Sequence, residues 1–274
     1  MKKLQRLLAA MLCASIFSAV AAHANIQGYA TVVRVVGMAS YSLGDDQWHP
    51  LQQGKYLPVG ATVRTGDDGI ADIVLGKEIL MPQAALQPDR ISLASDYPVR
   101  GLVNYKPSAD QNVIRVTPNT VVGLEKLTIT DTGADTVSDT ELNLKKGKIY
   151  ASVKKLTGAS QYLIKLPNGI AGVRGTLFSI SADGTIECFE SKNGGVMSSM
   201  IGEGGSAIIN TVQPGQGFSP NGGITVLPSS VMSNLKQLFS GLCTTYLQVV
   251  NFSFDHGQTY ISPTQGLRGR GNGQ

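Results

Sequence analysis

Hydrophobic and polar residues alternate with a period of two through much of the chain, which is the pattern of strands with one buried face. In the segment 148–154, Ile149, Ala151 and Val153 alternate with polar or aromatic side chains. Because successive side chains of a strand point to opposite faces of its sheet, the apolar set predicts an inward face. Similar short apolar runs recur about every 8–12 positions between turn residues, which is typical of a β-sandwich, barrel or solenoid.

Composition supports an all-β protein. The 274 residues include 32 glycines, while 15% are charged and 6% aromatic. Abundant glycine with modest charge suits many strands joined by tight turns. We therefore expect one β domain over residues 25–227, built of stacked short antiparallel strands or hairpins in a solenoid- or sandwich-like arrangement. Trp48, the only tryptophan, is expected to be a core or lid residue.

One internal region does not follow the strand pattern. Residues 82–112 contain four prolines and scattered charge, without apolar alternation. Proline removes a backbone donor and is poorly placed in a central strand. We expect an insertion in this range, either a hairpin or a surface loop.

The pattern changes from strand to helix after Pro228. Ser229 or Ser230 can cap a helix, and apolar residues then recur at helical spacing, namely Val231, Leu235, Leu238 and Phe239. Gly241 is the expected stop signal. The sequence predicts one amphipathic helix over 228–243 packed on the sheet, a short extended segment over 244–259 and a flexible Gly-rich tail over 260–274.

The first 24 residues have the three parts of a secretory signal peptide. A basic start with Lys2, Lys3 and Arg6 precedes an apolar run and the small-residue motif Ala22-His23-Ala24. We expect cleavage after Ala24, a periplasmic or secreted mature protein, and no transmembrane segment after cleavage. The alternative is an uncut membrane anchor, but the apolar run is short for a span.

Removing the leader removes most of the net positive charge. The whole chain has 23 basic and 19 acidic residues, and 23 less the three in the leader leaves 20 against 19. Nucleic acid and anionic membrane surfaces require a concentrated basic patch. We therefore expect neither as a partner.

Two cysteines remain in the mature chain, Cys188 and Cys243. An exported compartment permits a disulfide, which would tie the C-terminal helix to the sheet. Cys188 shares the inward face of its strand with Ile186, so two buried thiols are the alternative. The sequence leaves both open.

No pattern in the sequence indicates catalysis or metal binding. His49 and His256, the two histidines of the mature chain, lie far apart and lack further ligands at zinc spacing. No nucleophile elbow, phosphate-binding loop or metalloprotease motif is present. We expect no catalytic residues, no cofactor and no metal, and hence a protein that is not an enzyme.

The segment 142–180 carries the most specific motif, Val173-Arg174-Gly175-Thr176. A glycine beside an arginine in an apolar strand suggests a bulge or a close backbone approach. With Pro167 and Gly169 before it, this segment resembles the periplasmic FecR domain, whose best-known members are iron-uptake signal transducers. Two further blocks, 51–71 and 114–120, resemble the same family in the same order. The signature residues, which we expect to be structural, are Arg64, Thr65, Gly66, Gly147, Pro167, Gly169, Arg174, Gly175, Thr176 and Phe178.

Arg64 and Arg174 are the signature residues most easily mistaken for ligand-binding groups. Each stands at the end of a predicted strand, next to a Gly or Thr-Gly sequence. We expect both guanidinium groups to be held by backbone carbonyls or a buried carboxylate.

The resemblance implies a protein-interaction or signal-relay module with a protein partner in the cell envelope. The best-known transducers also have a cytoplasmic sigma-binding segment and an uncut transmembrane helix. We expect neither here, and therefore no transmembrane sigma-factor regulation. The alternative is a cell-wall or carbohydrate-binding protein, possibly enzymatic. A deep groove with aromatics and carboxylates would favour that alternative, whereas a flat or edge-strand surface would favour protein binding.

Overall fold

The computed structural model describes residues 25–45, 47–77, 112–132, 135–202 and 205–249, with only the backbone over 243–249. The strands of its first half are β1 Asn25–Gln27, β2 Tyr29–Val36, β3 Ala39–Ser42, β4 His49–Pro50, β5 Tyr56–Leu57, β6 Thr62–Thr65, β7 Ile70–Gly76, β8 Asn112–Val116, β9 Val121–Asp131 and β10 Thr136–Lys146. The elements of its second half are β11 Lys148–Ser152, β12 Gln161–Leu166, β13 Gly169–Val173, β14 Thr176–Ser181, β15 Ile186–Ser191, β16 Val196–Ile201, β17 Ala207–Val212, β18 Gln216–Ser219, β19 Gly223–Val226 and the helix α2 Ser229–Val249.

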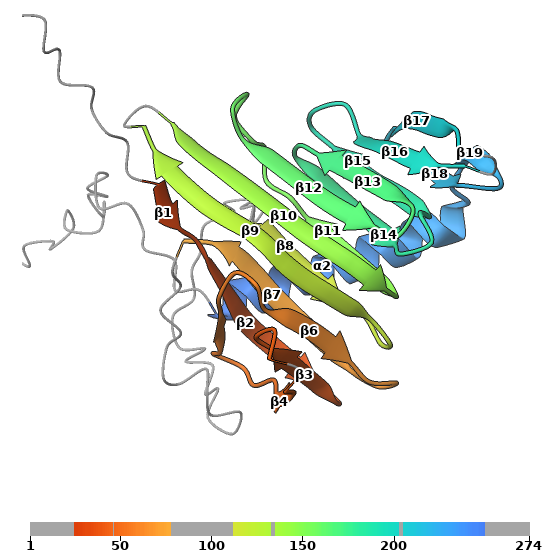
Figure 1. Ribbon diagram of the computed structural model, residues 1–274. Coiled ribbons are helices and arrows are strands. Elements are labelled where there is room, and N and C mark those ends of the chain that lie inside the picture. The colour runs from red at the N-terminus through yellow and green to blue at the C-terminus, as the bar shows by residue number, and fades with distance from the viewer. Residues whose placement is uncertain (1–24, 46, 78–111, 133–134, 203–204, 250–274) are drawn as a thin grey trace, which may run out of the picture.

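The strands form two sheets packed face to face (Figure 1). The ten-stranded sheet has the order β17-β16-β13-β12-β10-β9-β6-β3-β4, with β1 paired to β9. The nine-stranded sheet has the order β19-β18-β15-β14-β11-β8-β7-β2-β5. The predicted all-β architecture is confirmed, and it is a sandwich. One pairing differs from the antiparallel expectation, because β10 and β12 run parallel.

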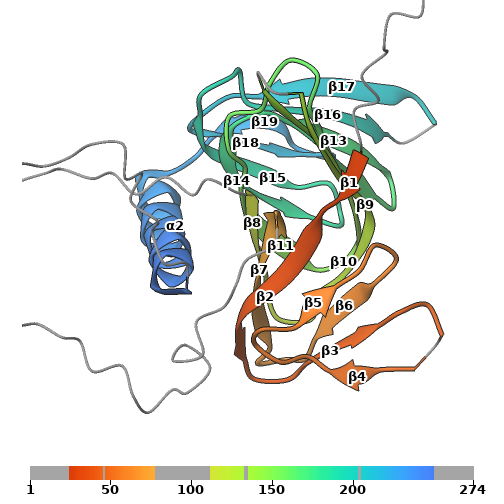
Figure 2. The same ribbon diagram turned by 90° about the vertical axis from the view of Figure 1, so that its left-hand side faces the viewer.

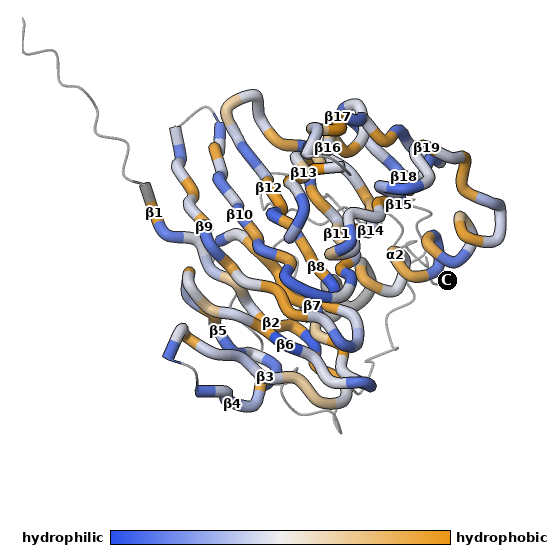
Figure 3. Tube along the Cα trace, turned by 45° about the vertical axis from the view of Figure 1, so that its right-hand side comes forward, coloured by the Kyte–Doolittle hydropathy of each residue, from blue (hydrophilic) through white to orange (hydrophobic). Residues whose placement is uncertain are grey.

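The core lies between the two sheets and follows the alternation in the sequence. Ile149 and Ala151 of β11 face inward and are fully buried, as their positions predict. Tyr162 and Ile164 of β12 enter the same core from the other sheet. Figure 3 shows the result as apolar stretches concentrated in the central strands, among them β7 and β8.

The chain crosses from one sheet to the other at corners made by glycine. β13 ends at Val173 in the ten-stranded sheet, and β14 begins at Thr176 in the nine-stranded sheet. Gly175 between them has φ +70°, which a residue with a side chain rarely adopts. The motif predicted to contain a bulge is therefore the corner where the chain changes sheets. The segment Gly66–Gly69 makes the equivalent change from β6 to β7.

Threonine hydroxyls connect successive turns in which the chain passes between the two sheets. The Thr65 hydroxyl donates to the Thr117 carbonyl at 2.6 Å and accepts from the Thr120 amide at 3.0 Å. The Thr120 hydroxyl accepts from the Lys148 amide at 3.1 Å, directly after Gly147. Gly147 has φ +82°, and a side chain there would collide with Thr120. These contacts hold together three connections between the sheets, namely β6–β7, β8–β9 and β10–β11.

Helix α2 covers the outer face of the nine-stranded sheet (Figure 2). Its buried side chains Leu235, Phe239 and Leu242 pack against Val33, Val74 and Val113 of the sheet. The Phe239 ring stacks on that of Phe189 with centroids 5.7 Å apart. The predicted amphipathic helix is confirmed, and so is its packing on the sheet.

The predicted end of the helix is wrong. Helix α2 continues through Gly241 to Val249, six residues past the expected limit of 243, so the predicted extended segment cannot begin at 244. Gly241 does not have the positive φ of a helix-terminating glycine. An interior glycine costs only about 1 kcal/mol relative to alanine. The burial of the neighbouring Phe239 and Leu242 is sufficient to offset that cost.

Several sequence predictions lie outside the described residues. These are the leader 1–24, nearly all of the expected insertion 82–112, and the segments from 250 onward. Among the residues that the structure does describe, no helix combines the length and apolar character needed to cross a membrane.

Candidate interaction surface

The signature residues do not converge on one site. Register pairs Lys148 with Ser181 and Ser152 with Leu177, so Gly147 and Thr176 lie at opposite ends of these strands. Arg64, Thr65 and Gly66 are at the β6–β7 corner, while Pro167 and Gly169 flank the β12–β13 turn. Phe178 is buried in the core. None of the signature residues lines the cavity described below.

Arg64 has different partners from those predicted. Its side chain is exposed, and its guanidinium lies 3.9 Å from the centroid of the Trp48 ring. Its Nε donates to the Ser40 hydroxyl at 2.8 Å. The expectation of a carbonyl or buried carboxylate partner is wrong, because Arg64 points outward from β6 and meets an aromatic ring there. Of the two positions expected for Trp48, core or lid, the core position is excluded, since its side chain is exposed.

Arg174 is held by one carbonyl, at the surface. Its Nη2 donates to the carbonyl of Gly158 at 3.0 Å, and the side chain is exposed. A carbonyl partner is one of the two kinds expected, and the contact lies at the surface. Gly175 provides the close approach at this corner, because a Cβ there would lie 3.1 Å from the Lys155 Cα.

A buried carboxylate with an arginine partner, one of the two arrangements expected for Arg64 and Arg174, occurs instead at Arg115. Arg115 of β8 donates from Nε to Asp72 at 2.7 Å and from Nη2 at 2.8 Å. Asp72 is fully buried, and Arg34 adds a second cation at 3.6 Å. A single charge inside each of three apolar strands was the available signal: Val-Arg-Val, Ala-Asp-Ile and Ile-Arg-Val. The register that brings them together could not be read from the sequence.

The outer face of the ten-stranded sheet carries charges of both signs that neutralise one another. Lys165 pairs with Glu125 at 2.7 Å and also with Glu141. Lys126 pairs with Asp139 at 2.8 Å. The hydrogen bond from Lys165 lowers the pKa of Glu125 below its usual value. Because cations and anions are interspersed and paired on this face, it does not offer a surface of one charge to a ligand.

Cys188 is a free thiol that faces the core. Its neighbour Phe189, on the other face of β15, contacts the helix residue Phe239. The side chain of Cys243 is outside the described residues, so the disulfide stays untested. The inward direction of Cys188, away from α2, favours the alternative of a buried thiol. Burial raises the pKa of this thiol to about 12.

One end of the sandwich is apolar and almost without charge. Between Lys192 and Lys236 the only charged residue is Glu203, which lies outside the described residues. We call residues 193–227 the uncharged end; they form β16–β19, at the upper right of Figure 1. Large hydrophobic side chains are exposed on it: Met197 61%, Ile201 60%, Ile209 73%, Ile224 43% and Val226 81%. Exposed apolar groups gathered in this way mark interaction surfaces more often than single exposed residues do.

Both sheets also have their longer edge strand at the uncharged end. β17 has six residues and is the outermost strand of the ten-stranded sheet, while β19 is the outermost strand of the nine-stranded sheet. The edge strands at the opposite end, β4 and β5, have two residues each, and β4 contains Pro50. Short strands and proline are common means of blocking edge-to-edge association. The chain uses them at one end and not at the other.

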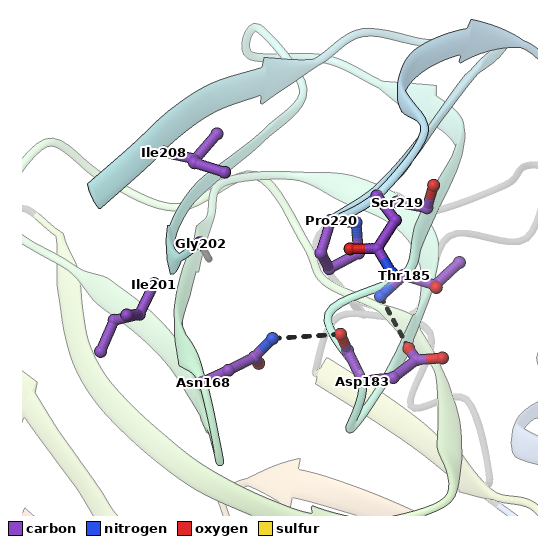
Figure 4. Close-up of a pocket in the computed structure, with 9 residues that line it drawn as sticks. Asn168, Asp183, Thr185, Ile201, Gly202, Ile208, Ser219 and Pro220 are labelled. Carbon is purple, nitrogen blue, oxygen red and sulfur yellow. Dashed lines mark hydrogen bonds between the residues drawn. The ribbon is translucent and has the colours of Figure 1, made fainter. Parts of the chain in front are cut away.

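A cavity of about 780 Å³ opens beside the uncharged end (Figure 4). Ile201 and Ile208 stand on one side of it, and Asp183, Thr185 and Pro220 on the other. The remaining lining residues are Asn168, Gly202, Ser219 and Asn221. The cavity therefore lies where the turns of the two sheets meet.

The polar groups of the cavity are mostly engaged in holding its own turns. Asn168 Nδ2 donates to the Asp183 carbonyl at 3.1 Å, and Asp183 Oδ1 accepts from the Thr185 amide at 2.8 Å. Asn168 Oδ1 has no partner among the described residues. None of the nine lining residues is aromatic, and Asp183 is the one carboxylate among them. This lining does not match the aromatic and carboxylate groove that carbohydrate binding would favour. The described residues also contain no group of three or more His, Cys, Asp or Glu placed to hold a metal.

Comparison with known proteins confirms the family resemblance over part of the chain. The family described as FecR protein matches residues 107–192. This range contains β8 to β15, and hence the blocks at 114–120 and 142–180 but not the block at 51–71. No curated protein matches the chain.

A solved structure, a "putative anti-sigma factor" from Parabacteroides distasonis, also resembles the chain. Its sequence identity is 13%, with 48% of this chain and 58% of that chain covered. The TM-score is 0.32, at which the likeness adds nothing to the interpretation.

Proposed function

We propose that the chain is a protein-interaction module of the cell envelope that relays a signal by binding a partner protein at its uncharged end. One observation carries the proposal: the end formed by β16–β19 combines exposed apolar side chains, an unblocked edge strand and a cavity, whereas the opposite end has blocked edges. Helix α2 covers one broad face of the sandwich, and ion pairs lie on the other. The opposite end also exposes apolar side chains, Met38 and Leu43 among them, but its edge strands are short and one contains proline.

The surface indicates the chemistry of the partner. Ile201 is exposed on the rim of the cavity, and Ile208 and Pro220 line its walls. An apolar side chain entering the cavity would displace water from these residues. We infer a partner segment with an apolar anchor and no dense charge, because the surface has no described charge apart from Asp183 to complement one.

The family match supports a protein partner and a part in signalling. The matched residues 107–192 supply the central strands of both sheets, which form the scaffold. The uncharged end follows directly after the matched range. A shared scaffold with a separate recognition surface agrees with the general rule that function is carried by sites added to folds.

We also propose that the mature protein is exported. The basic start and the Ala22-His23-Ala24 motif support cleavage after Ala24. The expected mature N-terminus is Asn25, at the start of β1. Mass spectrometry of the protein recovered from the cell envelope measures it. Recovery of the chain with its leader intact would contradict cleavage and indicate an anchor.

The binding proposal is tested by crosslinking and capture from envelope fractions with matched variants. Ile201→Lys places a charge at the rim of the cavity and should reduce capture of the partner at least tenfold, since the charge would be desolvated on binding. Leu43→Lys is the control, because Leu43 is also a large exposed hydrophobic residue but lies at the opposite end, next to β3. Equal loss of capture in both variants would contradict a binding surface at the uncharged end.

The alternative of carbohydrate binding receives no support from the cavity. Sugar sites use aromatic faces and several polar groups, and the lining residues provide no aromatic ring. That the protein is not an enzyme stays a prediction.

A further inference from the structure

We propose that β17 pairs with β17 of a second copy of the chain, so that a twofold dimer joins the two ten-stranded sheets edge to edge. The free edge of β17 belongs to the same uncharged end as the cavity, but pairing with a second copy does not require a partner protein at the cavity rim, and the two are tested separately. The hydrogen-bond alternation of β17, its symmetry and its side chains all suit this pairing.

The alternation of β17 determines which backbone groups are free. Gly202 N donates to the Ser206 carbonyl at 2.9 Å, so this pair is a hydrogen-bonded pair of the β16–β17 ladder. In an antiparallel ladder every second pair is of this kind. The register then makes Met200–Ile208 and Ser198–Asn210 hydrogen-bonded pairs. The N–H and C=O groups of the intervening residues of β17 point away from β16; these residues are Ala207, Ile209 and Thr211.

The free edge is symmetric about its central residue. When two antiparallel copies are centred on Ile209, Ile209 of each copy exchanges two hydrogen bonds with Ile209 of the other. Ala207 of each copy exchanges two with Thr211 of the other. All the N–H and C=O groups of this edge are then satisfied. Shifting the register between the two copies by two residues leaves some of these groups unpaired. Shifting it by one residue places side chains of opposite faces next to each other.

The side chains suit the same register. Ile209, 73% exposed, would pack against its own copy across the twofold axis on the outer face. Small Ala207 would lie opposite Thr211, so neither pair creates a clash of bulky groups. No residue of β17 is charged, and like charges therefore do not oppose one another across the axis. Because β17 is compatible with an antiparallel copy of itself in hydrogen bonding, side-chain size and charge, a second copy of the chain is the partner that fits its free edge.

The test is the mass of the mature protein in solution, measured by light scattering after gel filtration. The wild type should have twice the mass of one chain. Ile209→Lys places two like charges next to each other at the axis and should weaken self-association at least tenfold. Met197→Lys is the matched control, because Met197 is exposed on the same outer face but belongs to β16, one strand from the edge. It should remain a dimer.

The inference would be overturned by a monomeric wild type, by an Ile209→Lys variant that stays fully dimeric, or by equal dissociation of the control. A second variant covers the possibility that Ile209→Lys misfolds. Ile209→Cys should crosslink to itself through a short bifunctional thiol reagent, whereas Met197→Cys should not. Absence of the Ile209→Cys crosslink in a folded dimer would place the interface elsewhere. Loss of dimerisation with capture of the partner retained would separate this interface from the surface of the proposed function.

Discussion

The strand arginines have similar sequence neighbours but different surroundings. Arg115 is bonded twice to buried Asp72, Arg64 stacks on exposed Trp48, and Arg174 reaches one surface carbonyl. All of them follow an apolar β-branched residue. The sequence indicated that an arginine in a strand needs a partner. It could not indicate which one, because each partner comes from a segment that only the sheet register brings close.

These surroundings predict different costs of substitution. Arg115→Ala leaves Asp72 buried with only Arg34 nearby, and should lower the free energy of unfolding by about 3 kcal/mol or more. Arg174→Ala removes one exposed hydrogen bond and should cost about 1 kcal/mol or less. Chemical denaturation of both variants measures the difference. Similar losses would mean that Arg174, like Arg115, is bound in the interior.

The Cys188 thiol provides a second test at this scale. Its burial and its raised pKa of about 12 keep it protonated and shielded at neutral and mildly alkaline pH, and only the thiolate reacts. We expect almost no labelling of Cys188 at pH 8 in the native protein and full labelling after unfolding without a reductant. Peptide mapping of the labelled protein identifies the residue. Absence of labelling at both Cys188 and Cys243 after unfolding would indicate that they are bridged.

At the scale of elements, local sequence patterns predicted where strands and the helix lie, but not how they are connected and paired. Alternation located strands such as β11, and helical spacing located α2. The parallel pairing of β10 with β12 and the change of sheet at Gly175 were not predicted. Both depend on which sheet receives each strand, and a two-residue period carries no information about that choice. The segment 82–112, with its prolines, had no readable period at all.

The end of helix α2 was also not predicted from the local pattern, and its position can be tested. In the structure Gly241 lies inside α2, and nothing lies within 4 Å of a Cβ added there. Gly241→Ala should therefore raise the free energy of unfolding by up to about 1 kcal/mol, since alanine is the better helix former. A glycine at a helix end has positive φ, and alanine would then be destabilising. Thermal or chemical unfolding of the variant shows whether stability rises or falls. A rise places Gly241 inside the helix, and a fall places it at the helix end.

At the scale of the whole molecule, the asymmetry between its two ends was not predicted from the sequence. The low charge of residues 193–235 was visible, but it could equally describe a buried segment. The strand order shows that this segment supplies the edge strands of both sheets. The inward residues of this segment, such as Val196 and Met200, are fully buried, and the exposed apolar residues Met197, Ile201 and Ile209 lie on the outward face of β16 and β17. Which face each residue takes, and that these strands end the sheets, follow from the register and strand order.

Site-specific photo-crosslinking in intact cells tests the central claim, recognition of a partner at the uncharged end, most directly. A photoreactive amino acid replaces Ile201 or Asn221 at the cavity, or Leu43 at the opposite end, one position at a time. The account predicts a discrete adduct with another protein from Ile201 and Asn221, and none from Leu43. Adducts from Leu43 alone would contradict it, because they would place the partner at the end where the sheet edges are blocked.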